Sequence, residues 1–498
     1  MPYDYRRQAP VNRPRLKYPR KIRRRRRIIG TLTIIVILAV LIGYSVTLIK
    51  SPTKNVVATT TTSVPKPSTT ATDTSTGAET WRVVWGAPMA WGNNIVTNAS
   101  LREIIKSPTA GSALEIQISN LFGTAPLNLE DLNIAEVSSG ANLIQSTMSP
   151  LTFSGSTSVS VPVGQQLLSD PIQMNVSEGE TLAVSFYVLG SDLVTIHPCC
   201  TVGKNSFFTP NGRPNVANSV SGAAFGYSSP YPRFVDAMFL EQGSAQASSA
   251  GSIVIIGDSI TDGYNSATRW PDFLQDRIDK LPVNQQRAVV NEGITANALL
   301  SSPPLPRDDS KDGGGPSGLS RLNMDALSFP GVGTVVLFLG TNDLWFGATA
   351  TQLIQGMQQF ISEVKAAGIQ VIGVTLLPRM TSMKEIWTPL QQSYLEQVNN
   401  WILTSGSFNG VINLTSVISD TYNGQCSPTT IFPPYNSGDN LHPSPAGDLA
   451  MADAVPGNLF GFPNLPLLNP MVPVTPTPGC LGVTGIPSSA QLQQQLGN

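Results

Sequence analysis

One serine, one histidine and one aspartate in this sequence have the types and spacing that nucleophilic catalysis needs. Ser259 follows four β-branched apolar residues, 253–256, and a glycine, which predicts a strand buried on both faces that ends in a turn. The sequence contains two histidines, and His442 is the one downstream of this serine. Asp439 lies three residues before it. Because a serine hydroxyl needs a base, and a carboxylate can hold that base in the required tautomer, these residues predict acyl transfer.

Three further stretches follow the serine in a fixed order: residues 291–294 (NEGI), 340–343 (GTND) and 439–443 (DNLHP). Together with the GDS turn at 257–259 they resemble the four consensus blocks of the SGNH (GDSL-type) hydrolases. The resemblance covers roughly residues 250–455. No Gly-x-Ser-x-Gly elbow surrounds the serine, which argues against the α/β-hydrolase fold.

The resemblance implies a serine ester hydrolase with Ser259, Asp439 and His442 as its catalytic triad. It also implies an oxyanion hole made by the backbone N–H groups of Ser259 and Gly293 and the side-chain amide of Asn342. Each donor of this kind typically contributes about 3–4 kcal/mol of transition-state stabilisation. Such chemistry needs no cofactor.

Three other aspartates lie in the same blocks, Asp258, Asp262 and Asp343. We expect them to fix loops by hydrogen bonds, not to take part in catalysis. No metal is expected either, because the cysteine spacing offers no convincing zinc site and histidines are so few.

The segments around the blocks alternate between strand and helix patterns. Strands are predicted at 253–256, 288–290, 335–339, 369–376 and 411–413, and helices from 269 to 281, at 350–367, 385–403 and 449–455. This order indicates a doubly wound parallel sheet covered on both faces over residues 251–459. The resemblance to the SGNH hydrolases implies that this sheet is of the flavodoxin-like type. The blocks then fall at the carboxyl ends of strands, where such sheets bind ligands.

Residues 79–245 show a different pattern, with alternating strands such as those around Leu114, at 159–163 and at 182–188, punctuated by Gly, Asn, Ser and Pro. This predicts an antiparallel β-sandwich or jelly roll. Residues 119–124 and 196–198 are similar to the β-sandwich ahead of the hydrolase domain in some bacterial secreted SGNH proteins. A short flexible linker is expected at 243–251.

Aromatic residues and one histidine of this segment leave two interpretations open. Trp81, Trp85 and Trp91 could form a platform for sugar rings, or they could pack in the sandwich core or against the next domain, and packing is favoured. His197 is expected to be structural or to contribute to the rim of the active site.

Charge is strongly segregated along the chain. Residues 1–27 carry twelve Lys or Arg and one acid, so the remainder must carry −12 to reach the total of −1. An acidic folded part is poorly suited to nucleic acid, and no nucleic-acid partner is expected. Residues 28–49 are uncharged and long enough to cross a bilayer, which predicts a single-pass signal anchor at the cell membrane with a cytoplasmic amino terminus.

The remaining segments are low in complexity or rich in proline. Residues 50–78 are dominated by Thr, Ser and Pro and predict an extended stalk, and residues 460–498 predict a Pro-rich tail. The exported location permits disulfides between the four cysteines. Cys426 with Cys480 is the plausible pair, which leaves Cys199 and Cys200 as a vicinal pair or as two thiols, and four unpaired cysteines remain the alternative.

These predictions point to a membrane-anchored, extracytoplasmic serine esterase. The anchor, the stalk and the sandwich favour acyl groups on polysaccharide or another cell-surface glycan as the substrate. One alternative is an acyltransferase that uses the same triad with a sugar hydroxyl as acceptor. Another is a surface carbohydrate-binding protein with an inert hydrolase domain, and the four intact blocks argue against it.

Overall fold

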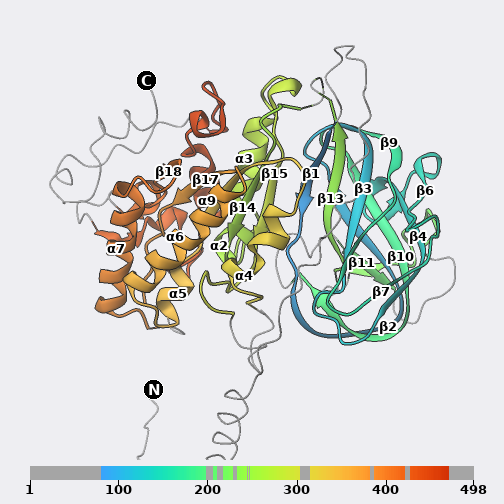
Figure 1. Ribbon diagram of the computed structural model, residues 1–498, viewed down its shortest axis with the longest axis horizontal. Coiled ribbons are helices and arrows are strands. Elements are labelled where there is room, and N and C mark those ends of the chain that lie inside the picture. Colours follow the sequence, from blue (N-terminus) through green and yellow to red (C-terminus); the bar gives the residue numbers. More distant parts are fainter. Residues whose placement is uncertain are drawn as a thin grey trace, which may run out of the picture. The chain divides into compact units, whose positions relative to one another are not determined.

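The computed structural model describes residues 80–197, 206–209, 217–227, 233–243, 245, 247–302, 314–381, 386–420 and 427–469. These residues form an antiparallel β-sandwich and an α/β domain built on a parallel sheet (Figure 1). The predicted basic tail, anchor at 28–49, stalk and last part of the tail lie outside the described residues, as do all four cysteines. Within the described ranges, no helix is both long and apolar enough to cross a membrane.

The sandwich has two antiparallel sheets. One sheet has the order β1-β13-β3-β8, with β9 also on β3, and the other has the order β12-β11-β2-β10-β4-β5, with β6 and β7 also on β4. The strands are β1 (Thr80–Gly86), β2 (Ala90–Lys106), β3 (Gly111–Ser119), β4 (Leu127–Ser139), β5 (Asn142–Leu143), β6 (Ser149–Pro150), β7 (Val159–Val161), β8 (Gln166–Leu168), β9 (Ile172–Val176), β10 (Thr181–Ile196), β11 (Ser206–Thr209), β12 (Gly226–Tyr227) and β13 (Val235–Gln242).

The alternating residues of β3 and β10 fill the space between these sheets, as the sequence predicts. Leu114 and Ile116 are buried in the same core as Val184 and Phe186. The third alternating run is shorter than predicted, because β7 ends at Val161 and Val163 is exposed. Pro162 lacks the N–H that would continue the ladder, and Gly164 turns the chain with a φ of 74°.

The parallel sheet has the order β15 (Val289–Gly293), β14 (Ser252–Gly257), β16 (Val332–Phe338), β17 (Gln370–Val374) and β18 (Gly410–Ile412). In chain order this is 2-1-3-4-5, the doubly wound arrangement that the sequence predicts. The helices are α2 (Ser259–Asp262), α3 (Trp270–Ile278), α4 (Gly318–Leu322), α5 (Thr341–Trp345), α6 (Ala350–Ala366), α7 (Pro389–Thr404), α8 (Thr415–Ile418) and α9 (Pro445–Asp453). A short hairpin of β19 (Ser419–Asp420) and β20 (Ser427–Ile431) precedes the loop that leads to α9.

Strand β14 is buried on both faces, which confirms the prediction for residues 253–256. Val254 and Ile256 pack in one core with residues of α6 and α7, while Ile253 and Ile255 pack in another core with residues of α3 and α9. The apolar helix pattern at 350–367 corresponds to α6.

Two boundaries predicted for the α/β domain need correction: the start of one of its helices and the end of the domain itself. Helix α7 begins at Pro389 and not at 385, because Thr388 and Gln391 form a reciprocal capping box there and proline suits the first helical turn. At the other end, the packed domain continues beyond 459. Phe460 and Phe462 are buried in its core, and Leu468 N donates to Asp453 Oδ1 at 2.9 Å.

The sandwich and the α/β domain share a hydrophobic core. Val83 of β1 and Phe239 of β13 lie in the same cluster as Val254 of β14. The expected flexible linker is tied down where it is described, because Ser248 N donates to Gln286 O at 2.8 Å and the Arg82 guanidinium donates to Ser248 O. The prediction of a free hinge is therefore wrong for this part of the linker.

The three tryptophans of the sandwich do not form one platform. Trp81 packs against the core shared with the α/β domain, whereas Trp85 packs against the core between the two sandwich sheets. Trp91 makes a tilted ring contact with Phe122 at 5.2 Å. This arrangement agrees with the favoured interpretation, which is packing.

Buried carboxyl groups near the shared core make stability depend on pH. Burial raises the pKa of the Asp236 carboxyl to about 8, although its Oδ2 accepts hydrogen bonds from Gln117 and Gln166. Burial also raises the pKa of Glu292 well above its ordinary range. The folded protein thus holds protons that the unfolded chain releases above about pH 4, so the free energy of unfolding falls as the pH rises towards 8.

We therefore expect the free energy of unfolding, measured by urea denaturation, to fall by a few kcal/mol between about pH 5 and pH 8. Asp236→Asn keeps an acceptor for the two glutamines and removes the titrating group, so this variant should show a clearly shallower decline. Equal slopes for the variant and the wild type would contradict the assignment to Asp236.

Candidate active site

Ser259 stands at the start of a short helix that follows β14, an interior strand of the sheet. Asp258 caps this helix, because its Oδ1 accepts a hydrogen bond from Ile260 N at 3.0 Å. Gly257 must lack a side chain here, since a Cβ atom would lie 2.2 Å from Thr261 Oγ1. The turn therefore places Ser259 beyond the carboxyl end of β14, as the sequence predicts.

The structure brings the three predicted triad residues together. Ser259 Oγ lies 2.8 Å from His442 Nε2, and His442 Nδ1 lies 2.6 Å from Asp439 Oδ2. Since Asp439 can only accept at Nδ1, the partners indicate that Nδ1 carries the proton and that Nε2 faces the serine as the acceptor. Ser259 and His442 are buried, while the Asp439 side chain is 31% exposed.

The loop that carries Asp439 holds this carboxylate in a fixed orientation. Its Oδ1 accepts from the backbone N–H groups of Leu441 and His442, at 3.0 and 2.9 Å, and its Oδ2 also accepts from Asn265 Nδ2 at 3.1 Å. Partial burial opposes ionisation, but the hydrogen bonds and charge of His442 hold the pKa of Asp439 well below its usual range. Tyr264 packs on the imidazole, with ring centroids 4.9 Å apart.

The donors predicted for an oxyanion hole have different surroundings. Asn342 lies in α5 and donates from Nδ2 to Asn297 O at 2.9 Å, which leaves the second hydrogen of that amide. Ser259 N is the first helical amide of α2 and has no intrahelical acceptor. Gly293 N, by contrast, donates to Asn291 Oδ1 at 3.0 Å.

Glycine at position 293 has a packing role in this structure. A Cβ atom there would lie 2.6 Å from Asp262 N and 2.9 Å from the Thr261 carbonyl carbon. Glycine at this position therefore allows α2 to lie close to the end of β15.

Residues 294–297, which follow Gly293, form a tight turn that the sequence patterns do not predict. Asn297 N donates to Ile294 O at 3.0 Å, and Ala296 in this turn has a φ of 62°. A side chain in this left-handed region is uncommon, and such strain concentrates at functional sites. Among the described residues, the Ala296 N–H has no acceptor.

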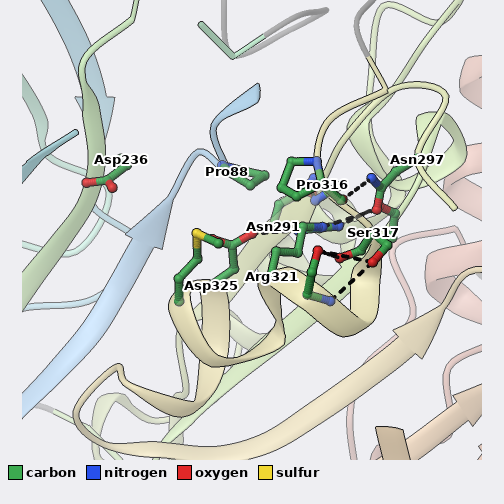
Figure 2. Close-up of polar contacts among 12 residues, drawn as sticks. Pro88, Asp236, Asn291, Asn297, Pro316, Ser317, Arg321 and Asp325 are labelled. Atoms are coloured by element: carbon green, nitrogen blue, oxygen red, sulfur yellow. Dashed lines mark hydrogen bonds and ion pairs between the residues drawn. The ribbon is translucent and has the colours of Figure 1, made fainter. Parts of the chain in front are cut away.

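Arg321 is a second residue that the sequence patterns did not reveal. This fully buried guanidinium donates to Gly257 O at 3.0 Å. It also donates to Asn297 Oδ1 at 3.1 Å and to Asp325 Oδ2 at 2.8 Å, and these residues are labelled in Figure 2. It thereby links the first residue of the GDS turn to the turn that binds Asn342. Asp325 lies four residues after Arg321, but Gly257 and Asn297 come from distant parts of the chain, so the segment 318–322 gives no local signal for this role.

The other aspartates of the blocks form the loop-fixing hydrogen bonds expected of them. Asp258 caps α2, Asp262 accepts from Thr295, and Asp343 accepts from Leu299 N and Leu300 N at 2.8 Å each. Burial raises the pKa values of both Asp258 and Asp343 to about 6.

Comparison with known proteins agrees with this geometry. Residues 255–450 match the family model described as the GDSL-like Lipase/Acylhydrolase family. No curated protein matches the chain significantly. Among solved structures, a lipase/acylhydrolase from Enterococcus faecalis is 22% identical with a TM-score of 0.32, covering 42% of this chain and 96% of its own.

A GDSL-like lipase from Bacteroides thetaiotaomicron is 18% identical with a TM-score of 0.31, covering 42% of this chain and 88% of its own. These structural similarities carry no argument about function, and the family similarity is that of residues 255–450 to the family model.

Proposed function

We propose that this chain, whose residues 255–450 form a GDSL-like lipase/acylhydrolase domain, hydrolyses carboxylic esters through an acyl-enzyme at Ser259. The observation that carries the proposal is the continuous chain of hydrogen bonds from Ser259 Oγ through His442 to Asp439. This arrangement contains a nucleophile, a base and a group that orients the base, which are the three parts that serine acyl transfer requires.

In the first half of the reaction, His442 Nε2 takes the hydroxyl proton while Ser259 Oγ attacks the ester carbonyl carbon. The imidazolium that forms is stabilised by Asp439, which stays ionised. The tetrahedral intermediate then collapses, the leaving alcohol receives the proton from His442, and the acyl group remains on the serine. In the second half, water repeats the attack and releases the carboxylic acid, so no cofactor is needed.

The developing negative charge on the carbonyl oxygen is stabilised by Ser259 N–H and by the free hydrogen of the Asn342 amide. Gly293 N–H could contribute only by giving up its bond to Asn291. We assign the third donor to Ala296 N–H instead, because it lacks an acceptor and lies in the turn whose Asn297 O binds Asn342.

We further propose that residues 28–49 anchor the protein in the cell membrane and that the stalk at 50–78 holds the catalytic domain outside the cytoplasm. The segregation of positive charge into residues 1–27 supports this orientation. The substrate is then an acylated polysaccharide or another cell-surface glycan. The anchor and the stalk support this substrate class, whereas the separated tryptophans of the sandwich do not.

The decisive experiment is to measure hydrolysis by the intact protein in detergent of p-nitrophenyl acetate, p-nitrophenyl laurate and acetylated xylan. A fluorophosphonate probe, which labels activated serines, is used beside them with Ser259→Ala as the control. We expect labelling at Ser259 and faster release of acetyl than of lauroyl groups. A protein that is labelled and transfers acyl groups only to added sugar would be an acyltransferase, and a protein that is neither labelled nor active would not be an esterase.

A further inference from the structure

His197 belongs to the sandwich but binds the helix that carries the proposed nucleophile. It follows β10, and its ring is almost fully buried. Nδ1 lies 2.8 Å from Pro88 O, and Nε2 lies 3.1 Å from Asp262 Oδ1. Asp262 is the last residue of α2, the helix that begins with Ser259.

The partners of His197 determine where its protons lie. Pro88 O is a carbonyl and can only accept, so Nδ1 carries a hydrogen. A carboxylate oxygen faces Nε2, so a second proton lies between Nε2 and Asp262 Oδ1. The imidazole therefore bridges two hydrogen-bond partners, and it joins the Pro88 carbonyl of the sandwich to Asp262 of α2.

Asp262 extends this bridge to the proposed oxyanion hole. Its second oxygen, Oδ2, accepts from Thr295 N at 2.9 Å and from Thr295 Oγ1 at 2.7 Å. Thr295 immediately precedes Ala296 in the turn that ends at Asn297, and Asn297 O accepts from Asn342 Nδ2 at 2.9 Å. One carboxylate thus connects the nucleophile helix, the oxyanion turn and the sandwich.

We propose that His197 is a positioning residue for the esterase site, which fixes Asp262 and through it the relative placement of α2 and the turn at 294–297. This inference rests on the proposed function, because that function gives Ser259 and Ala296 their roles. It makes the β-sandwich a part of the active site, in contrast to an appended module that only binds a ligand.

The alternative is that His197 only stabilises the contact between the sandwich and the α/β domain. Such a residue would change the amount of folded protein and leave the turnover of each folded molecule unchanged. Ser252 offers a matched control, because its buried hydroxyl also donates across this contact, to Val83 O, but from the first residue of β14 at the opposite end from the GDS turn.

The experiment compares His197→Ala, Asp262→Ala, the double variant, Asp262→Asn and Ser252→Ala in the intact protein. The kcat and KM for p-nitrophenyl acetate, the rate of fluorophosphonate labelling and the Tm are measured for each. We expect His197→Ala to lower kcat and the labelling rate by about 10-fold or more with little change in KM, because small displacements of reacting groups are costly. Asp262→Ala should lower kcat and the labelling rate further, since it also removes the acceptor of the Thr295 hydrogen bonds. The double variant should have the same kcat as Asp262→Ala alone.

Asp262→Asn is the conservative test of the same bridge. The amide oxygen can still accept from Thr295, and the amide NH₂ can donate to a neutral Nε2, so the variant should keep kcat within about threefold. Ser252→Ala should keep the wild-type kcat. If His197→Ala does not fold, His197→Gln carries the same comparison, because the single amide nitrogen of glutamine cannot reach both Pro88 O and Asp262 Oδ1.

The activity and labelling of the wild type test the proposed function, whereas the variants test the positioning role of His197. A wild-type protein that is neither active nor labelled would overturn the proposed function and this inference with it. An active wild type with a His197→Ala variant of equal kcat, or effects that multiply in the double variant, would overturn only the positioning role.

Discussion

Replacing Ser259 or His442 with alanine is expected to lower kcat for ester hydrolysis by about 10⁶-fold, with the double variant no worse than either single variant. The serine attacks only while His442 Nε2 can take its proton across the 2.8 Å contact, so neither group works without the other. Steady-state hydrolysis of p-nitrophenyl acetate and fluorophosphonate labelling both measure this loss.

The same variants should remain folded. Ser259 Oγ is bonded to His442, and removal of one buried hydrogen bond typically costs about 1 kcal/mol, so the Tm should fall by only a few degrees. Ser252→Ala removes a buried serine hydroxyl at the other end of the same strand and should keep full activity. Hydrolysis by Ser259→Ala at more than about one-thousandth of the wild-type rate would assign the chemistry to another group.

The placement of Ser259 could be predicted because it depends on local patterns. Four β-branched residues followed by glycine are sufficient to indicate a buried strand and a turn, and short polar residues then start a helix. The loop at 439–442 is equally local, since three residues separate the carboxylate from the imidazole. The alternation of strands and helices predicts a doubly wound sheet, and the resemblance to the SGNH hydrolases implies its flavodoxin-like strand order.

The hydrogen-bond partners of single amides could not be predicted in this way. Gly293 lies where the block pattern places it, but whether its N–H is free depends on the side-chain conformation of Asn291. Ala296 has its positive φ because it lies in the turn whose Asn297 O accepts from Asn342, and an alanine in the sequence does not indicate such a conformation.

Contacts between the two domains could not be predicted from the sequence patterns either. Strand β13 is buried on both faces: Met238 packs in the core between the sandwich sheets, and Phe239 packs in the core shared with the α/β domain. No sequence pattern identifies the domain that covers the second face. The bond from His197 to Asp262 joins residues 65 positions apart on two different folds. The burial of His197 and its hydrogen bonds at both nitrogens result from the packing of one domain on the other, and they leave no pattern in the sequence.

Asp439→Asn is the second variant with a large expected effect, and the structure explains why an isosteric change should be so damaging. Oδ1 of Asp439 accepts from two backbone N–H groups, those of Leu441 and His442. An asparagine here must therefore keep its carbonyl oxygen at the Oδ1 position, which places its NH₂ group at the Oδ2 position. This NH₂ group then points at His442 Nδ1 and also faces the Asn265 amide donor.

A donor at that position forces Nδ1 to accept, so the imidazole must carry its hydrogen on Nε2, where the base is needed. We expect kcat to fall by about 10⁴-fold with KM little changed, because the geometry is kept while the tautomer is wrong. Asp448→Asn is the matched control, since this buried carboxylate in α9 accepts from Ser266 and Thr268 and has no bond to the triad. If Asp439→Asn retained more than about one-tenth of the wild-type kcat, the tautomer of His442 would have to be set by a group other than Asp439.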